Sequence, residues 1–99
     1  MSTVEARRAL LDDASTIVTT DRNIEYGEPE DTFARIATLW SAYLGVTIRD
    51  IDVAILMIQM KVARLSANPN SRDSWLDVAG YAACGWGAAV ERVTQQARE

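Results

Sequence analysis

An all-α fold, a compact four-helix bundle-like domain, is the class that the sequence predicts, and three observations support it. Four segments carry apolar residues at spacings of three and four, the period of an amphipathic helix. Proline, glycine and asparagine lie between these segments, where helices begin and end. No segment alternates apolar and polar residues as a strand would. The 99 residues form a single domain, and because so small a core is marginal alone, we expect a homo-oligomer.

The first two helices are predicted over residues 4–19 and 29–44. Pro29 suits the first helical turn because it has no N–H to leave unpaired there, and Gly45 suits the C-terminal end. In the loop over residues 21–28, we expect Gly27 to adopt a positive φ. The residues expected to face the core are Ala6, Leu10, Ala14, Ile17, Val18, Phe33, Ile36, Ala37, Trp40, Tyr43 and Leu44.

The third and fourth helices are predicted over residues 48–67 and 71–96. Thr47 and Asp50 resemble a capping box at the start of the third helix, and Asn70 or Ser71 can cap the fourth. The third helix has almost no polar side, which predicts that neighbouring elements surround it.

Three glycines interrupt the fourth helix: Gly80, Gly85 and Gly87. Each costs a helix roughly 1 kcal/mol relative to alanine. We therefore expect them to permit the close approach of another helix, either from the same chain or from a second subunit.

Composition excludes several classes of function. Ten Lys and Arg residues stand against fourteen Asp and Glu, and this net charge of −4 argues against binding to duplex nucleic acid or to anionic membranes. The chain has no histidine and a single cysteine, Cys84, which excludes histidine-based catalysis, disulfides and thiolate clusters within the chain. The N-terminus lacks the pattern of an export signal, and the most apolar stretch, residues 51–65, is too short to span a membrane. We expect a cytoplasmic protein.

One polar cluster is predicted inside the bundle. Lys61 is the only lysine, and together with Arg64 it lies on the most apolar helix. A short connection makes the third and fourth helices antiparallel neighbours, which brings these cations towards Asp73 and Asp77. Buried cations require carboxylates or a bound anion nearby.

Two interpretations of this cluster are open. It can be a structural ion-pair network that fixes the register of the two helices. Alternatively it can be a nucleotide-phosphate site, in which Lys61 and Arg64 bind phosphate oxygens and Asp73 and Asp77 act as catalytic residues and Mg²⁺ ligands. Further candidates for contacts with the nucleotide are Tyr26, Arg35, Trp40 and Tyr81.

Two segments of the chain resemble a small helical family of bacteriophages and prophages whose function is unassigned. The first runs through Tyr26-Gly27-Glu28-Pro29 to Leu44-Gly45, and the second includes Lys61-Val62-Ala63-Arg64-Leu65 and the stretch from Asp73 to Ala82. These motifs are also similar to phage nucleotide-modification-associated domains. More distantly they resemble the all-α MazG-like pyrophosphatases, oligomeric enzymes that cleave nucleoside triphosphates with Mg²⁺.

This resemblance implies a nucleotide-binding accessory protein and leaves catalysis open. MazG-like enzymes carry Glu-x-x-Glu on one helix and Glu-x-x-Asp on the next, whereas here only Asp73 and Asp77 can stand for the second pair. Three hypotheses follow: a Mg²⁺-dependent nucleotide hydrolase, a non-catalytic oligomer that sequesters a nucleotide signal, and a protein-interaction module with a purely structural cluster.

Overall fold

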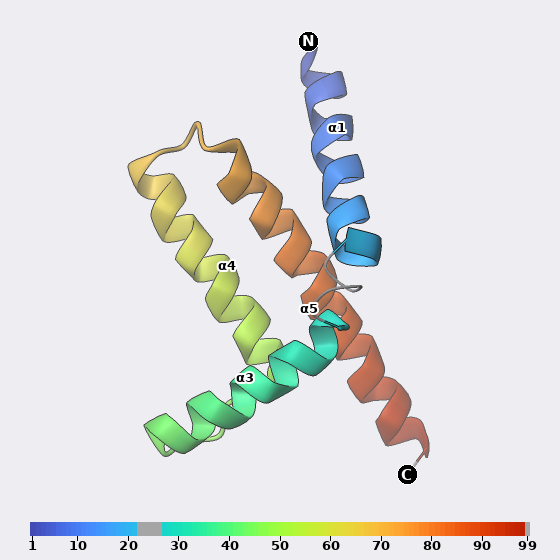
Figure 1. Cartoon of the computed structure of the whole chain (residues 1–99), viewed down its shortest axis with the longest axis vertical. Helices are drawn as coiled ribbons and strands as arrows, with labels where there is room; N and C mark the ends of the chain where they lie inside the picture. Colours follow the sequence, from blue (N-terminus) through green and yellow to red (C-terminus); the bar gives the residue numbers. More distant parts are fainter. Residues whose placement is uncertain (22–26, 99) are drawn as a thin grey trace.

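The computed structural model describes residues 1–21 and 27–98, and its elements are all helical. They are α1 (Thr3–Thr16), the π-helical η1 (Ile17–Asp21), α3 (Pro29–Leu44), α4 (Asp50–Ala67) and α5 (Arg72–Arg98). Helices α4 and α5 form an antiparallel hairpin, and α3 crosses one end of it (Figure 1). The predicted all-α class is confirmed.

Local signals set the ends of α3, which match the prediction. Pro29 occupies the first turn, and Gly45 ends the helix in the left-handed conformation with φ 70°. Gly27, before the helix, has φ 82°, as expected for the turn. The first helix changes to a π-helix at Ile17, within the β-branched run that starts at Thr16, because such side chains crowd a regular α-helix.

The start of α4 differs from the prediction. Thr47 and Asp50 do not form its cap; instead the Asp52 carboxylate accepts hydrogen bonds from the backbone N–H and the guanidinium of Arg49, both at 2.9 Å. The helix therefore begins at Asp50 and not at residue 48. At the start of α5, Ser71 acts as one of the two predicted caps, since its hydroxyl accepts from the Ser74 N–H at 3.3 Å.

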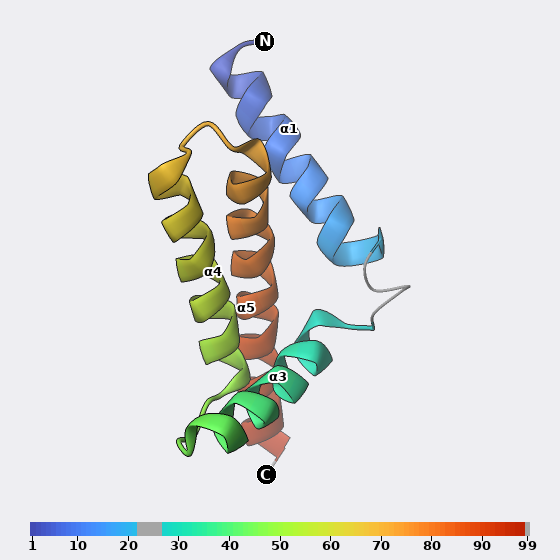
Figure 2. The ribbon, with the colours of Figure 1, turned by 60° about the vertical axis from the view of Figure 1, so that its left-hand side comes forward.

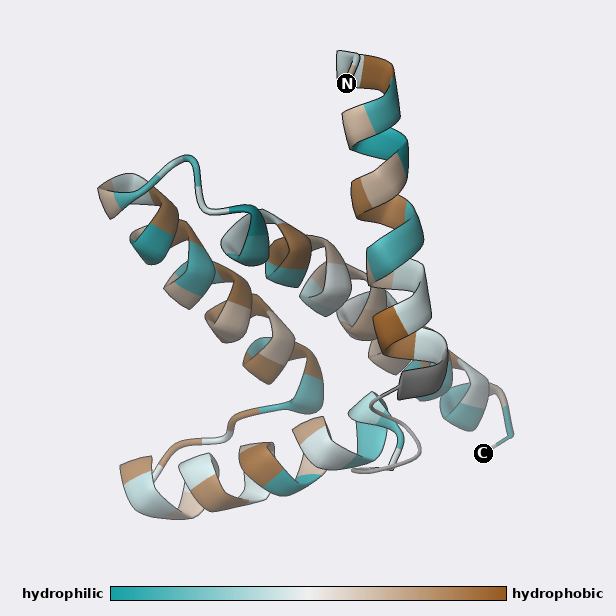
Figure 3. Cartoon of the chain, turned by 45° about the horizontal axis from the view of Figure 1, so that its top comes forward, coloured by the Kyte–Doolittle hydropathy of each residue, from teal (hydrophilic) through white to brown (hydrophobic). Residues whose placement is uncertain are grey.

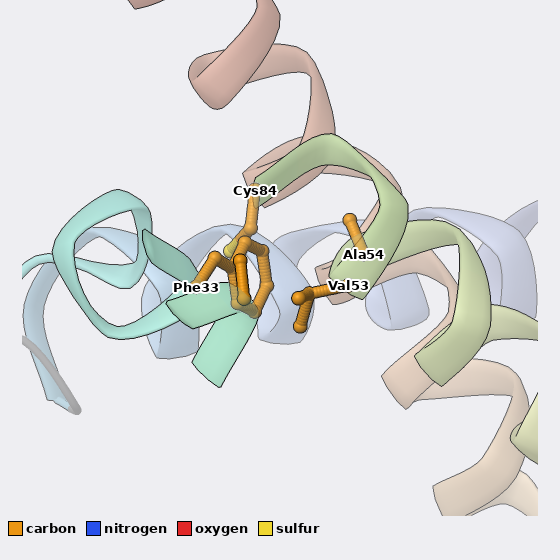
Figure 4. Packing of buried hydrophobic residues seen from close by; sticks show 5 residues of the cluster. Phe33, Val53, Ala54 and Cys84 are labelled. Carbon is orange, nitrogen blue, oxygen red and sulfur yellow. The ribbon is translucent and has the colours of Figure 1, made fainter. Parts of the chain in front are cut away.

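The core lies where α3, α4 and α5 meet (Figure 4). It is formed by Phe33, Ala37, Val53, Ala54 and Cys84. The close approach of α4 and α5 depends on Gly85, because a Cβ built there would lie 3.1 Å from the Cβ of Ala54. The chain's own helix thus supplies the close approach expected at this glycine.

Several expectations about burial were wrong. Ala6 was expected to face the core but is exposed on the first turns of α1. Tyr43 is 90% exposed and Leu44 is exposed too, because α3 extends past the hairpin at its C-terminal end. Helix α4 is not surrounded: Ile55 and Val62 are half exposed. The reason is that α1 and α3 lie on the same side of the α4–α5 hairpin, as Figure 2 shows, and leave the opposite side uncovered.

Figure 3 shows hydrophobic residues in every helix, whereas the α4–α5 connection is hydrophilic.

Candidate functional site

A pocket of about 210 Å³ lies between α1, η1, α3 and α5, with one residue of α4 at its wall. Helix α5 provides one whole face of it, since residues three and four apart lie together on a helix. That face consists of Leu76, Asp77, Gly80, Tyr81 and Cys84. Opposite it stand Thr32, Phe33 and Ile36 of α3. Most of the lining is apolar. Gly80 adds no side chain to the wall, and a Cβ at this position would lie 3.5 Å from the side chain of Val18.

Asp77 is the one ionisable carboxylate among the described residues that line this pocket. Its Oδ2 atom lies 2.8 Å from the Nζ of Lys61, which reaches across from α4. The Lys61 side chain is only 11% exposed and that of Asp77 is 30% exposed. A buried ammonium needs such an acceptor, because its desolvation is otherwise uncompensated. Lys61 therefore holds the carboxylate at the edge of the pocket.

The predicted cluster of four charged residues is present only in part. Arg64 and Asp73 are both exposed, and neither belongs to an ion pair within the described part of the chain. The physical reason is that their neighbours occupy the helix interface. Leu65 is buried in place of Arg64, and Ser74 is buried in place of Asp73.

Of the other predicted ligand residues, the structure places one at the pocket and two others away from it. Tyr81 lines the pocket, and its ring packs against Phe33 with centroids 6.4 Å apart. Arg35 is exposed on α3, away from the pocket wall, and Trp40 packs against the core. Tyr26 lies outside the described residues. The structure thus brings Lys61, Asp77 and Tyr81 to one place and leaves Arg35, Arg64 and Asp73 at the surface.

The apolar part of the pocket was missed by the sequence interpretation. Phe33 and Ile36 were predicted as core residues, and Leu76 as part of the apolar face of the last helix. They line the pocket because the α1–η1 segment, α3 and α5, which are distant in sequence, enclose a space between them. The one local signal was Gly80, whose missing side chain leaves that space open.

Metal ligands are sparse in this arrangement. Asp73 and Asp77 stand one helical turn apart, but Asp77 is engaged by Lys61. Within residues 1–21 and 27–98, no group of three or more acidic or cysteine side chains is placed to hold a metal ion. In the same residues, no helix has the length and apolar character needed to cross a membrane.

Comparison with known proteins gives a family for this helical chain. A family model described as a domain of unknown function, DUF6378, matches residues 9–89. The chain belongs to the DUF6378 family. The DUF6378 match includes all of α3 and α4 and both members of the Lys61–Asp77 pair. It therefore covers the whole pocket described above.

Two phage proteins are similar to this DUF6378 chain. The Gene 55 protein of Mycobacterium phage D29 is 44% identical over 88 residues, which are 89% of the chain and 55% of that protein. The Gene 55 protein of Mycobacterium phage L5 is 41% identical over 75 residues, 75% of the chain and 48% of that protein. The chain thus spans about half the length of these curated relatives. No solved structure matches it. The expected relationship to bacteriophage proteins is confirmed.

Proposed function

We propose that this protein binds a nucleotide, with the base in the α1–α3–α5 pocket and the phosphates outside it. The observation that carries this proposal is the position of Asp77, a carboxylate at the edge of a largely apolar space. A nucleobase has flat apolar faces and N–H donors at its rim, which suits a pocket with aromatic walls and one fixed acceptor.

The size of the pocket favours a base over a larger group. Its 210 Å³ lies below the roughly 300–1,000 Å³ of sites that enclose drug-sized ligands. The sugar and phosphates would consequently remain in solvent. Phe33 of α3 and Tyr81 of α5 offer ring surfaces to a base, and Thr32 of α3 offers a hydroxyl.

We expect the exposed arginines Arg64 and Arg35 to make the contacts with phosphate. Lys61 is already paired with Asp77, so its role is to position that carboxylate. Arg64 stands about one turn farther along α4 and Arg35 lies on α3, and the solvent-exposed positions of both leave them accessible to phosphate oxygens. Mg²⁺ would arrive with the phosphates, and Asp73 is the carboxylate proposed for it, because Asp77 is engaged by Lys61.

The resemblance to nucleotide-modification-associated and MazG-like domains supports the same class of ligand. It leaves open whether the nucleotide is cleaved or only held. The positions expected to react in a hydrolase, Asp73 and Asp77, lie on consecutive turns of α5. A carboxylate engaged by an ammonium is a weaker metal ligand, which favours a binding protein over a hydrolase.

The test is a thermal-shift screen of the full chain with nucleosides, monophosphates and triphosphates, with and without Mg²⁺. A ligand at 100 times its Kd should stabilise the fold by about 2.7 kcal/mol, a shift of several degrees. Nucleotide recovered intact identifies an accessory binding protein. Mg²⁺-dependent release of pyrophosphate identifies a hydrolase.

Matched variants on α3 locate the site. Thr32→Phe places a ring in the pocket and should abolish the nucleotide-induced shift. Thr38→Phe adds the same ring at an exposed position of the same helix and should leave the shift unchanged. No shift with any nucleotide, or a shift that survives Thr32→Phe, would overturn the proposal and favour a purely structural Lys61–Asp77 pair.

A further inference from the structure

Large apolar side chains of the α4–α5 hairpin are exposed, and one side of the hairpin faces away from α1 and α3. In Figure 1, α3 crosses in front of both helices, and the turned view of Figure 2 places α1 and the start of α3 on that same side. The opposite side has no covering element within the described residues. We define the hairpin face by its exposed apolar residues: Ile55 and Val62 of α4, with Trp75, Ala82, Trp86 and Val93 of α5.

We propose that the hairpin face binds the hairpin face of a second copy of this chain. Trp86 is 70% exposed and Trp75 is 49% exposed, which is unusual for the largest apolar side chain. The exposed apolar area of the face is roughly 600 Å² per chain, of the order of the roughly 800 Å² per partner that stable dimers bury.

The spacing of residues on α5 favours self-association in an antiparallel arrangement. Trp75, Ala79, Ala82, Trp86, Ala89 and Val93 alternate at steps of four and three, the heptad pattern of a coiled-coil seam. An antiparallel two-fold axis at the level of Cys84 sets Trp86 against the partner's Ala82. The same axis sets Trp75 against the partner's Val93, and Ala79 against the partner's Ala89.

This pairing is complementary in size, because a large side chain meets a small or medium one at each level apart from the alanine pair. A parallel pairing would instead set each tryptophan against its own copy. The repeat of one surface patch on both partners is what a two-fold dimer requires.

Charge also favours a second copy over a nucleic acid or an anionic membrane. The seam residues from Trp75 to Val93 are all uncharged, so two copies meet without repulsion. The same lack of basic residues removes the attraction that a nucleic acid or an anionic membrane would need. The dimer surface lies on the opposite side of the hairpin from α1 and α3, so the proposal is independent of nucleotide binding.

The first experiment measures the mass of the full chain by light scattering at micromolar concentrations. We expect twice the mass of one chain, and half that value for Trp86→Glu with its helical circular dichroism retained. Tyr43→Glu, at an exposed position on α3, should remain dimeric. A wild-type monomer at 100 micromolar protein, or a dimer that survives Trp86→Glu, would overturn the proposal.

A second experiment tests the direction of pairing by cross-linking in a Cys84→Ser background. Ala79→Cys and Ala89→Cys chains should form a disulfide when mixed and oxidised, and neither should cross-link alone. Cross-linking of either variant with itself would indicate a parallel pairing and overturn the antiparallel seam. Since Ala79 and Ala89 are both partly exposed and lie outside the core cluster, these substitutions do not depend on repacking the core.

Discussion

The ammonium of Lys61 and the carboxylate of Asp77 join α4 to α5 at a distance of 2.8 Å, beside the pocket. Arg64, three residues after Lys61 on α4, is exposed. Asp73, four residues before Asp77 on α5, is exposed too. The predicted cluster of four charged residues is thus reduced to one ion pair, which joins the two helices and presents an acceptor to the pocket.

Breaking this pair should destabilise the fold asymmetrically. Asp77→Ala leaves the ammonium without an acceptor in a largely buried position, and we expect a loss of about 2–4 kcal/mol. Lys61→Met should cost less, about 1–2 kcal/mol, because the Asp77 carboxylate is nearer to solvent. Urea denaturation measures both, and the double variant Lys61→Met/Asp77→Ala should lose less stability than the two single variants lose together. Additive losses in that cycle would show that the pair contributes no coupling.

Removing charge from Arg64 should leave stability unchanged. Arg64 is exposed and forms no ion pair with the described residues, so Arg64→Gln should change the free energy of unfolding by less than about 0.5 kcal/mol. The same variant should weaken binding of a triphosphate more than binding of the nucleoside, because only the former offers phosphate oxygens. An equal effect on both ligands would contradict a phosphate contact.

Acid should loosen the start of α4. Hydrogen bonds from the Arg49 side chain and backbone lower the pKa of Asp52 from its ordinary 3.8 to about 2. The folded state therefore favours the ionised carboxylate, and its contribution to stability is present above pH 4 and lost as the pH falls towards about 2. An NMR titration of the Asp52 carboxyl carbon should give this low midpoint, and Arg49→Gln should raise it. A midpoint near 4 in the wild type would mean that the Arg49 contacts do not form in solution.

The sequence predicted those parts of the structure that local chemistry determines. Pro29 and Gly45 fixed both ends of α3, because the proline ring and a left-handed residue act within one turn. Lys61 was identified because a single lysine on an apolar helix needs a partner. The short connection, which forces α4 and α5 to be antiparallel neighbours, left Asp73 and Asp77 as its candidate partners, and the structure decides for Asp77.

What the sequence did not predict depends on helix rotation and on contacts between distant segments. Leu65 and Ser74 take the interface positions expected for Arg64 and Asp73, a difference of one residue on each helix. Periodicity defines an apolar side of a helix but does not say which neighbour covers it. For that reason α4 was expected to be surrounded, whereas Ile55 and Val62 face outwards.

Two glycines of α5 should respond in opposite directions to the same substitution. At Gly80 a new Cβ would lie 3.5 Å from Val18, an ordinary contact, so Gly80→Ala should stabilise the protein by up to about 1 kcal/mol through helix propensity. At Gly85 the new Cβ would lie 3.1 Å from the Cβ of Ala54. Both atoms are fixed to helical backbones and neither can rotate away, so the helices must separate. We expect a net loss of about 1 kcal/mol for Gly85→Ala, since overpacking exceeds the gain in propensity. Urea denaturation of the two variants in parallel measures the difference, and a stabilised Gly85→Ala would mean that α4 and α5 pack less closely in solution.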